Sequence, residues 1–330
     1  MGRKTLKLAT LILGFGAALT GCGAQYRSDL AETKFPPLGD FVTVDNARVH
    51  YVQRGKGPDL ILLHGAGGNL REFTFSLMDQ LTERYTVTAF DRPGLGYTDQ
   101  VPGVPTAPTS TQGDSPQDQA RLLRRAAEEL GIQNPIILGH SYGGIVTYAW
   151  AVEALDTPSV ANPVAIVSVS GVTMPWPGDL GRFYTVSGSA IGGAVAVPLI
   201  SAFVPRTLVN DRVADTFTPQ PAPPGYVDYI GAGLTLRPDS FRANARQVNT
   251  LRPHVVTLSA RYPELVLPIE IVHGTADTTV PIHIHAEEVI KIAPTANLVR
   301  LQGVGHMPQQ TNPDDVIAAI ERAAVRAGLH

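Results

Sequence analysis

Short apolar runs recur along the chain, and stretches with helical patterning separate several of them. The runs suited to strands buried on both faces lie at 59–63, 86–90, 135–138, 164–169, 269–272 and 297–301. Ahead of them, alternating apolar and polar positions at 41–44 and 49–52, joined by Asp45 and Asn46, predict a β-hairpin. This order predicts an α/β fold with a mostly parallel central sheet and helices on both faces.

The clearest helix is expected at 116–130. Ser115 is a suitable N-cap, Pro116 fits the first helical position, and Gly131 follows the last. A second helix is expected at 145–154, directly after a glycine-rich turn.

One long stretch between Ser170 and Pro268 lacks strand patterning. It contains apolar helical material at 189–204, a proline-rich turn at 219–224, and helical patterns near 226–234 and 239–251. Loops this long are uncommon in compact domains and are usually functional. We therefore predict a helical cap inserted at 172–264, with the core formed by 41–171 and 265–330.

The apolar part of this cap carries no charged residue from Phe183 to Pro205, so a membrane-spanning helix is an alternative. Four helix-weakening residues interrupt it: Gly188, Gly192, Gly193 and Pro198. They favour a buried or interfacial cap helix.

The first residues are typical of a targeting segment. Three basic residues, Arg3, Lys4 and Lys7, precede an apolar run at 8–19, which is shorter than the roughly 20 residues that a transmembrane helix needs. The tetrapeptide that ends in Cys22, Leu-Thr-Gly-Cys, resembles the lipobox of bacterial lipoprotein signals.

That resemblance implies a signal peptide at 1–21 and lipidation of Cys22. The protein would then be anchored by lipid to a bacterial membrane, facing the periplasmic or extracellular side. The alternative is an ordinary signal peptide and an unrelated cysteine. Residues 22–40, which include Pro36 and Pro37, are expected to form a tether.

Composition excludes several classes of protein. With 330 residues, of which 44% are hydrophobic and 17% charged, the chain can build a substantial core. The formal net charge of −3, without a basic block in the body of the chain, argues against a nucleic-acid partner. Cys22 is the single cysteine, which excludes an intramolecular disulfide.

No cofactor or metal is expected. The strands are not accompanied by a phosphate loop or a Rossmann glycine signature. His283 and His285 are two residues apart, a spacing that suits neither a helical ligand pair nor a zinc pattern, and we expect them to begin a surface helix.

A candidate nucleophile lies in "GHSYG", residues 139–143, which matches the pattern G-x-S-x-G. An apolar run precedes it and a helical segment follows it. This strand–turn–helix context is what exposes a nucleophilic serine above a sheet. Ser141 is the candidate, and the alternative is a turn serine without catalytic function.

A serine hydroxyl needs a base to take its proton and an acid to orient that base. Asp277 and His306 follow Ser141 in the chain, each in a loop after a predicted strand, so all three are expected at the carboxyl edge of the sheet. Three other acids are less well placed because none follows a predicted strand so directly: Asp179, Asp211 and Asp215.

An oxyanion hole needs two backbone N–H groups aimed at the developing charge. We expect them from Tyr142, which follows the nucleophile, and from Ala66 in "HGAGG". His64, Gly65 and Gly67 are expected to support that loop.

These motifs, together with "DRPGLGYT", "HGTADTTVP" and "GVGHMPQQTNP", resemble the α/β-hydrolase superfamily, specifically its capped serine members. The resemblance runs from about residue 41 to 329. It implies that Ser141 is the nucleophile, Asp277 the acid and His306 the base. It also implies that Asp91 and Arg92, in the "DRPG" turn, are structural. Haloalkane dehalogenases and epoxide hydrolases carry aspartate at this turn, so a serine disfavours both.

The resulting hypothesis is a carboxylesterase or lipase-like serine hydrolase that forms an acyl-enzyme. The lipid anchor and the apolar cap suggest a small-molecule substrate with an apolar acyl group. Alternatives within the same fold are a C–C bond hydrolase and a cofactor-free peroxidase-like enzyme. A catalytically inactive, hydrolase-like binding protein is a further alternative.

Overall fold

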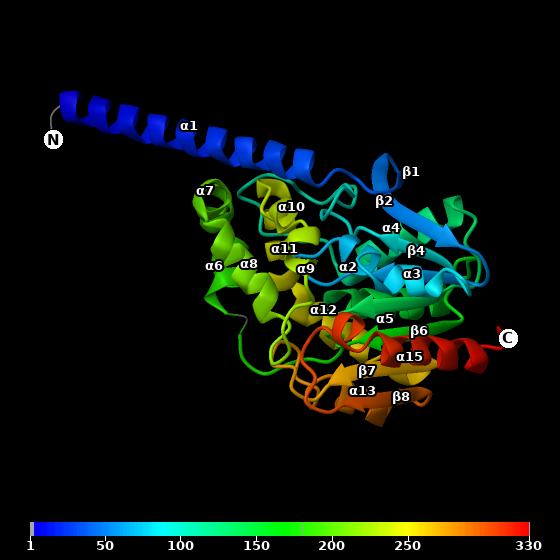
Figure 1. Ribbon diagram of the computed structural model, residues 1–330. Coiled ribbons are helices and arrows are strands. Elements are labelled where there is room, and N and C mark those ends of the chain that lie inside the picture. Colours follow the sequence, from blue (N-terminus) through cyan, green and yellow to red (C-terminus); the bar gives the residue numbers. More distant parts are fainter. Residues whose placement is uncertain (1–2, 180, 330) are drawn as a thin grey trace.

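The computed structural model, which describes residues 3–179 and 181–329, is built on an eight-stranded sheet (Figure 1). The strands are β1 (Asp40–Val44), β2 (Ala47–Gly55), β3 (Asp59–Leu63), β4 (Thr86–Phe90), β5 (Ile136–His140), β6 (Ala165–Val169), β7 (Ile269–Gly274) and β8 (Ala296–Leu301). Their order is β1-β2-β4-β3-β5-β6-β7-β8, with β2 antiparallel to both neighbours and all other pairs parallel. The predicted fold class is confirmed.

The opening hairpin turns at Asp45 and Asn46, which have φ angles of 51° and 66°. Two consecutive residues with positive φ are typical of the two-residue turns that suit the twist of paired strands. Each of the six other predicted strands is present, with ends displaced by two residues at most. These apolar runs are bounded by turn residues on both sides, which explains the accuracy of their limits.

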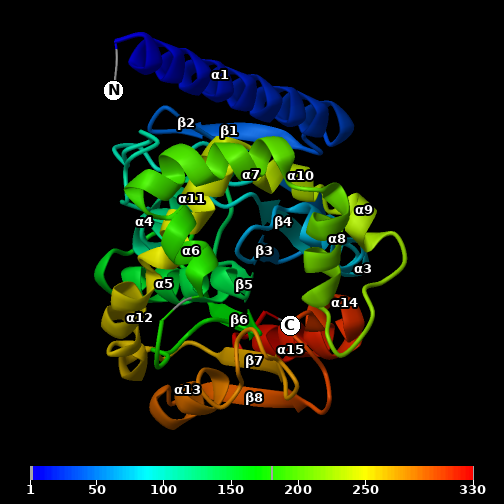
Figure 2. The ribbon, with the colours of Figure 1, turned by 90° about the vertical axis from the view of Figure 1, so that its left-hand side faces the viewer.

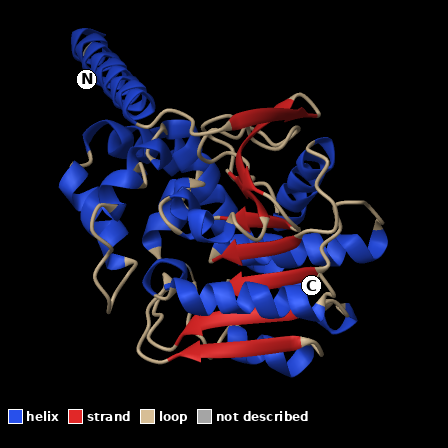
Figure 3. Ribbon diagram, turned by 45° about the vertical axis from the view of Figure 1, so that its right-hand side comes forward, coloured by secondary structure: helices blue, strands red, loops and turns tan. Residues whose placement is uncertain are grey.

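Helices cover both faces of the sheet (Figure 3). Those of the core are α2 (Arg71–Thr74), α3 (Leu77–Leu81), α4 (Pro116–Glu129), α5 (Tyr142–Asp156), α13 (Ala286–Ile292), α14 (Pro308–Thr311) and α15 (Pro313–Arg326). Helix α4 begins as predicted, with a capping box between Ser115 and Asp118. Gly131 follows it with a φ of 73°.

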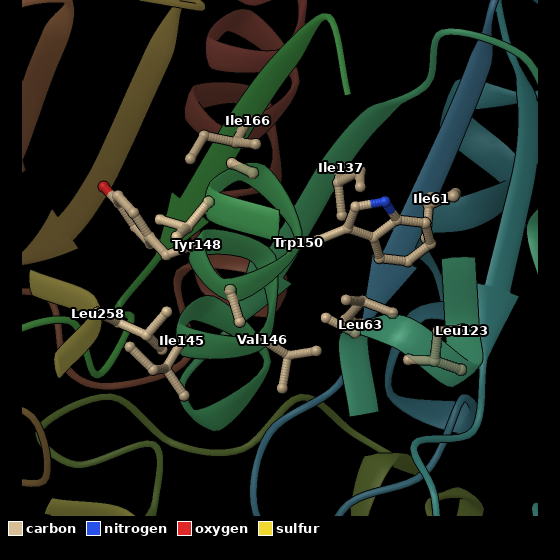
Figure 4. Close-up of a cluster of buried hydrophobic side chains, with 14 of the residues drawn as sticks. Ile61, Leu63, Leu123, Ile137, Ile145, Val146, Tyr148, Trp150, Ile166 and Leu258 are labelled. Carbon is tan, nitrogen blue, oxygen red and sulfur yellow. The ribbon is translucent and has the colours of Figure 1, made fainter. Parts of the chain in front are cut away.

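The core has two halves because successive residues of each strand point to opposite faces. On one face, Ile61 and Leu63 of β3 pack with Trp150 of α5 and Leu123 of α4 (Figure 4). On the other face, Leu60 and Leu62 pack with residues of α3 and α15. Burial of each large side chain contributes about 1.5–3 kcal/mol, so β5 and the turn that follows it are firmly held.

Along the chain, a series of helices follows β6 and precedes β7, inside the segment predicted as a cap. Its elements are α6 (Arg182–Ser187), η1 (Gly192–Ala196), α7 (Val197–Phe203), α8 (Arg206–Asp215), α9 (Tyr226–Tyr229), α10 (Ala232–Thr235), α11 (Pro238–Asn249), α12 (Leu251–Ser259) and η2 (Tyr262–Glu264). The helix predicted at 189–204 is a π-helical turn, η1, followed by α7. The helix predicted at 226–234 is divided at Gly231, which has a φ of 66°.

Helix α1 (Arg3–Lys34) is continuous through the predicted cleavage point before Cys22. Small buried residues at helical spacing, Ala24, Ser28 and Ala31, face the rest of the protein. Gly23 lies against Ala202 of α7, where a Cβ on Gly23 would be 3.3 Å from the Ala202 Cβ. Residues 22–34 are therefore a packed helix, whereas we expected a tether.

Two further contacts hold α1. The Arg27 guanidinium donates to the Val204 carbonyl at 2.7 Å, and Arg237 of the cap pairs with Glu32 at 2.8 Å. In the described part of the chain, no single helix is long and apolar enough to cross a membrane. One pair of helices, Gly192–Phe203 and Arg206–Asp215, meets the criterion of length and composition together but is bent by 101°.

Candidate active site

Ser141 lies in a sharp turn between β5 and α5. Its φ of 52° and ψ of −116° are rare for a residue with a side chain and cost about 1–3 kcal/mol. Its N–H donates to the Val169 carbonyl at 3.0 Å, which holds the turn against β6. The strain is therefore maintained by the sheet itself.

The glycines around Ser141 are required by close backbone packing. A Cβ on Gly139 would lie 2.2 Å from the carbonyl oxygen of Gly143, and a Cβ on Gly143 would lie 2.1 Å from that of Leu63. Neither position has space for a side chain. The two sides of the turn are thus packed directly against each other, and the start of α5 is packed against the end of β3.

Asp277 and His306 form a hydrogen bond, with 2.7 Å between Asp277 Oδ2 and His306 Nδ1. They lie in the loops after β7 and β8, and both are buried. Asp277 Oδ1 accepts hydrogen bonds from the N–H groups of Thr279 and Val280, each at 2.9 Å. The carboxylate is thereby oriented. No residue that the structure describes forms a hydrogen bond with the other ring nitrogen of His306, Nε2.

The charge states suit a base oriented by an acid. Burial alone would raise the pKa of Asp277, but hydrogen bonds from His273 and His306 hold it well below its usual range. Burial lowers the pKa of His306, and the opposing effect of Asp277 does not reverse this. At neutral pH the pair is a carboxylate and a neutral imidazole, the form that can accept a proton.

Ser141 and His306 are connected through His140. The His140 Nε2 lies 2.9 Å from the carbonyl oxygen of His306, and the two imidazole rings are 4.9 Å apart between centroids. The structure thus brings the loop of His306 against the residue that precedes Ser141. Asp179, Asp211 and Asp215 are not the partners of His306, because Asp277 occupies that position.

The predicted oxyanion loop lies beside Ser141. A Cβ on Gly65 would be 3.0 Å from the Ser141 Cβ. Among the residues that the structure describes, none accepts a hydrogen bond from the N–H of Ala66 or Tyr142. Both donors are therefore available to an oxyanion. The N–H of Gly67 is not, because it donates to Asn244 Oδ1 of α11 at 2.7 Å.

His64 and Arg92 hold this loop in place by hydrogen bonds to its carbonyl groups. His64 Nε2 accepts a hydrogen bond from the Arg92 N–H at 2.9 Å, so its Nδ1 donates to the Gly65 carbonyl at 2.9 Å. Burial, and next the charge of Arg92, lower the pKa of His64 to about 4 and keep the ring neutral. The Arg92 guanidinium donates to the carbonyls of His64 and Gly65 and covers the ring of Tyr142.

Asp91 holds a neighbouring turn. It lies 2.6 Å from His50 Nδ1 and accepts hydrogen bonds from the N–H groups of Leu70 and Tyr97, each at 2.7 Å. Neither Asp91 nor Arg92 is placed by these bonds in contact with Ser141.

Sequence reasoning missed a buried carboxylate, Glu72. It lies 2.7 Å from His140 Nδ1, accepts from the Gly65 N–H at 3.3 Å, and accepts from Gln309 at 3.0 Å. Burial would raise the pKa of Glu72, but the charge of His140 holds the Glu72 pKa below its usual value. Burial would likewise lower the pKa of His140, but the charge of Glu72 raises the His140 pKa above its usual value. The only signal in the sequence was an acid a few residues after the oxyanion motif.

Two histidines considered as metal ligands do not gather with others. Within 3–179 and 181–329 no group of three or more histidine, cysteine or acidic side chains could hold a metal ion. His285 precedes α13, and its Nδ1 accepts from the N–H groups of Thr173 and Met174 at 3.3 and 3.1 Å. Its position is explained by these structural bonds.

Comparison with known proteins agrees with this architecture. A family model described as the alpha/beta hydrolase family matches residues 60–319. A protein of unassigned function from Mycobacterium tuberculosis is 26% identical over 294 residues, which cover 87% of this chain and 81% of that protein.

Two solved structures share the fold. An esterase from Rhodococcus sp. ECU1013 superposes with a TM-score of 0.64 at 22% identity and covers 89% of this chain and 100% of its own. A structure described as a membrane phospholipase A has a TM-score of 0.62 at 20% identity, with coverage of 100% and 99%. The second likeness therefore includes helix α1.

Proposed function

Since this chain belongs to the alpha/beta hydrolase family, matched over residues 60–319, we propose that it is a serine hydrolase that cleaves a carboxylic ester through an acyl-enzyme. The observation that carries the proposal is the combination of Ser141 in a strained turn after β5 with the buried pair of Asp277 and His306. These are the nucleophile, acid and base that ester hydrolysis requires.

In the proposed reaction, His306 Nε2 takes the proton of the Ser141 hydroxyl while Oγ bonds to the ester carbonyl carbon. The N–H groups of Ala66 and Tyr142 bind the oxyanion that forms. When this intermediate collapses, the carbon–oxygen bond to the alcohol breaks, and His306 gives its proton to the departing oxygen. Water then loses a proton to His306 while its oxygen bonds to the acyl carbon. When this second intermediate collapses, the bond to Ser141 Oγ breaks, His306 returns the proton to Oγ, and the acid is released.

The cap and the relatives favour an ester with an apolar acyl group. The segment between Phe183 and Pro205 has no charge. The structural neighbours described as an esterase and as a membrane phospholipase A are enzymes that act on esters by their names. Such likeness at low identity supports the choice of substrate class by analogy.

We further propose that Cys22 carries acyl chains and anchors the protein outside the cytoplasm of a bacterial cell. The side chain is exposed, and Cys22 ends the tetrapeptide that resembles a lipobox. Each buried methylene contributes about 0.8 kcal/mol, so several chains give firm attachment. Mass spectrometry of the membrane-extracted protein should find the acyl masses on Cys22, and Cys22→Ser should lose them.

The test of the activity is labelling with a fluorophosphonate, which reacts with activated serines. The full chain should be labelled, Ser141→Ala should not, and Ser110→Ala, in the loop between β4 and α4, should be labelled as the parent is. Turnover of p-nitrophenyl esters by Ser141→Ala should fall by about 10⁴-fold or more. A folded parent chain that resists labelling would instead support a binding protein, and cleavage of ketones but not esters would support a C–C bond hydrolase.

A further inference from the structure

Six large apolar side chains are exposed along consecutive elements of the cap. They form what we call the apolar cap face: Phe183 and Val186 of α6, Ile191, Val195 of η1, and Leu199 and Phe203 of α7. Ile191 is 79% exposed and Phe203 62%. Isolated exposed apolar residues are common on proteins, but a continuous set marks an interaction surface.

Helix α7 carries apolar side chains on its exposed side as well as on its buried side. Val197 and Ala202 of α7 are buried, Ala202 against Gly23 of α1, while Leu199 and Phe203 are exposed. A surface helix of a water-exposed protein carries polar residues on its outer side. The outer side of α7 therefore suits an apolar environment.

Helix α1 lies along the edge of this face. Gly23 packs on Ala202 of α7, and Arg27 bonds to the carbonyl that follows α7. Cys22 is exposed and precedes this contact by one residue. Figure 2 shows α6, α7 and α8 on the side turned to the viewer, with α1 running across their upper edge. Leu19, one turn before Gly23, is also exposed.

Basic residues border the face where lipid headgroups would lie. Arg182 begins α6, and Arg206 begins α8 immediately after the apolar segment. Arg206 and Arg27 line a cavity of about 100 Å³ between α1 and the cap. An apolar centre with a basic rim is the pattern of proteins that insert into the interface of an anionic bilayer.

We propose that the apolar cap face inserts into the surface of the same lipid bilayer that holds the N-terminal segment. The shared edge with α1 argues for a bilayer over a second copy of the chain. Cys22, where lipid would be attached, precedes the contact of Gly23 with α7, so an acyl chain would leave the protein at the border of this face. The inference adds a membrane-binding surface to the proposed anchoring and does not depend on hydrolysis.

The test uses tryptophan fluorescence in vesicles with brominated acyl chains, which quench a tryptophan that reaches them. The full chain carrying Ser141→Ala, which avoids lipid hydrolysis, receives either Ile191→Trp or Val266→Trp. Val266 is the matched control because it is also 79% exposed, but it lies before β7, at the end of the sheet opposite to the site. The vesicles contain phosphatidylcholine and phosphatidylglycerol, and the parent chain supplies the background of the native tryptophans.

We expect the fluorescence of Trp at 191 to fall about two-fold on bromination, and that of Trp at 266 to stay unchanged. Adding Phe203→Asp should reduce the quenching at 191 while the melting temperature stays within a few degrees, since the residue is exposed. Equal quenching at both positions, or none at 191, would overturn the proposal. Dissociation of a dimer by Phe203→Asp, measured by light scattering, together with no quenching would assign the face to a second copy.

Discussion

One imidazole ring, that of His140, connects the carboxylate of Glu72 to the main chain of His306. Its Nδ1 lies 2.7 Å from Glu72, and its Nε2 lies 2.9 Å from the His306 carbonyl. Glu72 also accepts from the N–H of Gly65 in the oxyanion loop. A single buried ion pair thus joins the turn of Ser141, the loop of Gly65 and the loop of His306.

Glu72→Gln should destabilise the protein by about 3 kcal/mol, because it removes one partner of a buried ion pair. Chemical denaturation should measure this loss as a lower free energy of unfolding. Glu129→Gln, at an exposed position near the end of α4, is the control and should have an effect within about 0.5 kcal/mol. Equal effects of the two substitutions would contradict a stabilising ion pair.

The cost of Glu72→Gln should also depend on pH. Because the pKa of His140 is raised in the folded protein, its charged form stabilises the fold. This contribution is complete below the pKa of histidine in the unfolded chain, about 6.5, and is lost as pH rises through the pKa in the folded protein. The lowered pKa of Glu72 means that its contribution is present above about 4.3 and is lost as pH falls through the folded pKa. The difference in stability between parent and variant should be largest between these two values and smaller at pH 9.

Asp277→Asn should reduce kcat by about 10³–10⁴-fold with little change in stability. The amide oxygen can still accept from the N–H groups of Thr279 and Val280. The amide NH₂, however, would then face His306 and favour the wrong tautomer of its ring. Steady-state kinetics and the melting temperature separate these two effects. A large loss of stability with a small loss of kcat would indicate that Asp277 is a loop anchor only.

The pH dependence of kcat/KM should show an acid limb that reports His306. The base must be neutral to act, and burial lowers its pKa from the ordinary value of about 6.5. The rate should therefore rise with pH through an inflection below that value and be constant from there to neutral pH. An inflection above pH 7 would contradict the assignment of this histidine as the base.

Asn244→Ala should lower kcat/KM by about ten-fold, equivalent to about 1.4 kcal/mol, the size of one lost hydrogen bond. Asn244 of the cap holds the N–H of Gly67, so its removal loosens the loop that presents Ala66. Asn249→Ala, at the exposed end of the same helix, is the matched control. Comparable activity of the two variants would show that the cap does not position the oxyanion loop.

The strands could be predicted because each is a short apolar run between turn residues, and parallel strands buried on both faces leave that pattern. Helix α8 was not predicted. None of its residues is buried, so its sequence lacks the apolar positions at helical spacing by which a helix is recognised. The packing of 22–34 was missed because its contact surface is made of small residues, Ala24, Ser28 and Ala31, which carry little hydrophobic signal.

The candidate site also contains residues that the sequence could reveal and residues that it could not. Ser141, Asp277 and His306 could be proposed because each follows a strand within a recognisable motif. Glu72 and His140 are far apart in the chain and have no shared motif, and only the folded sheet brings the short helix α2 against the end of β5. Long-range ion pairs of this kind are determined by topology, which local patterns do not record.

With the proposed lipid anchor at Cys22, the continuity of helix α1 would limit how the protein meets its substrates. Between Cys22 and Lys34 the helix rises about 18 Å. This length is packed against the cap and is not a flexible linker. With its acyl chains in a bilayer, the catalytic domain would not sweep the surrounding volume but would travel within one plane. Its search for substrate would be two-dimensional, governed by lateral diffusion and by the surface density of esters in its own membrane.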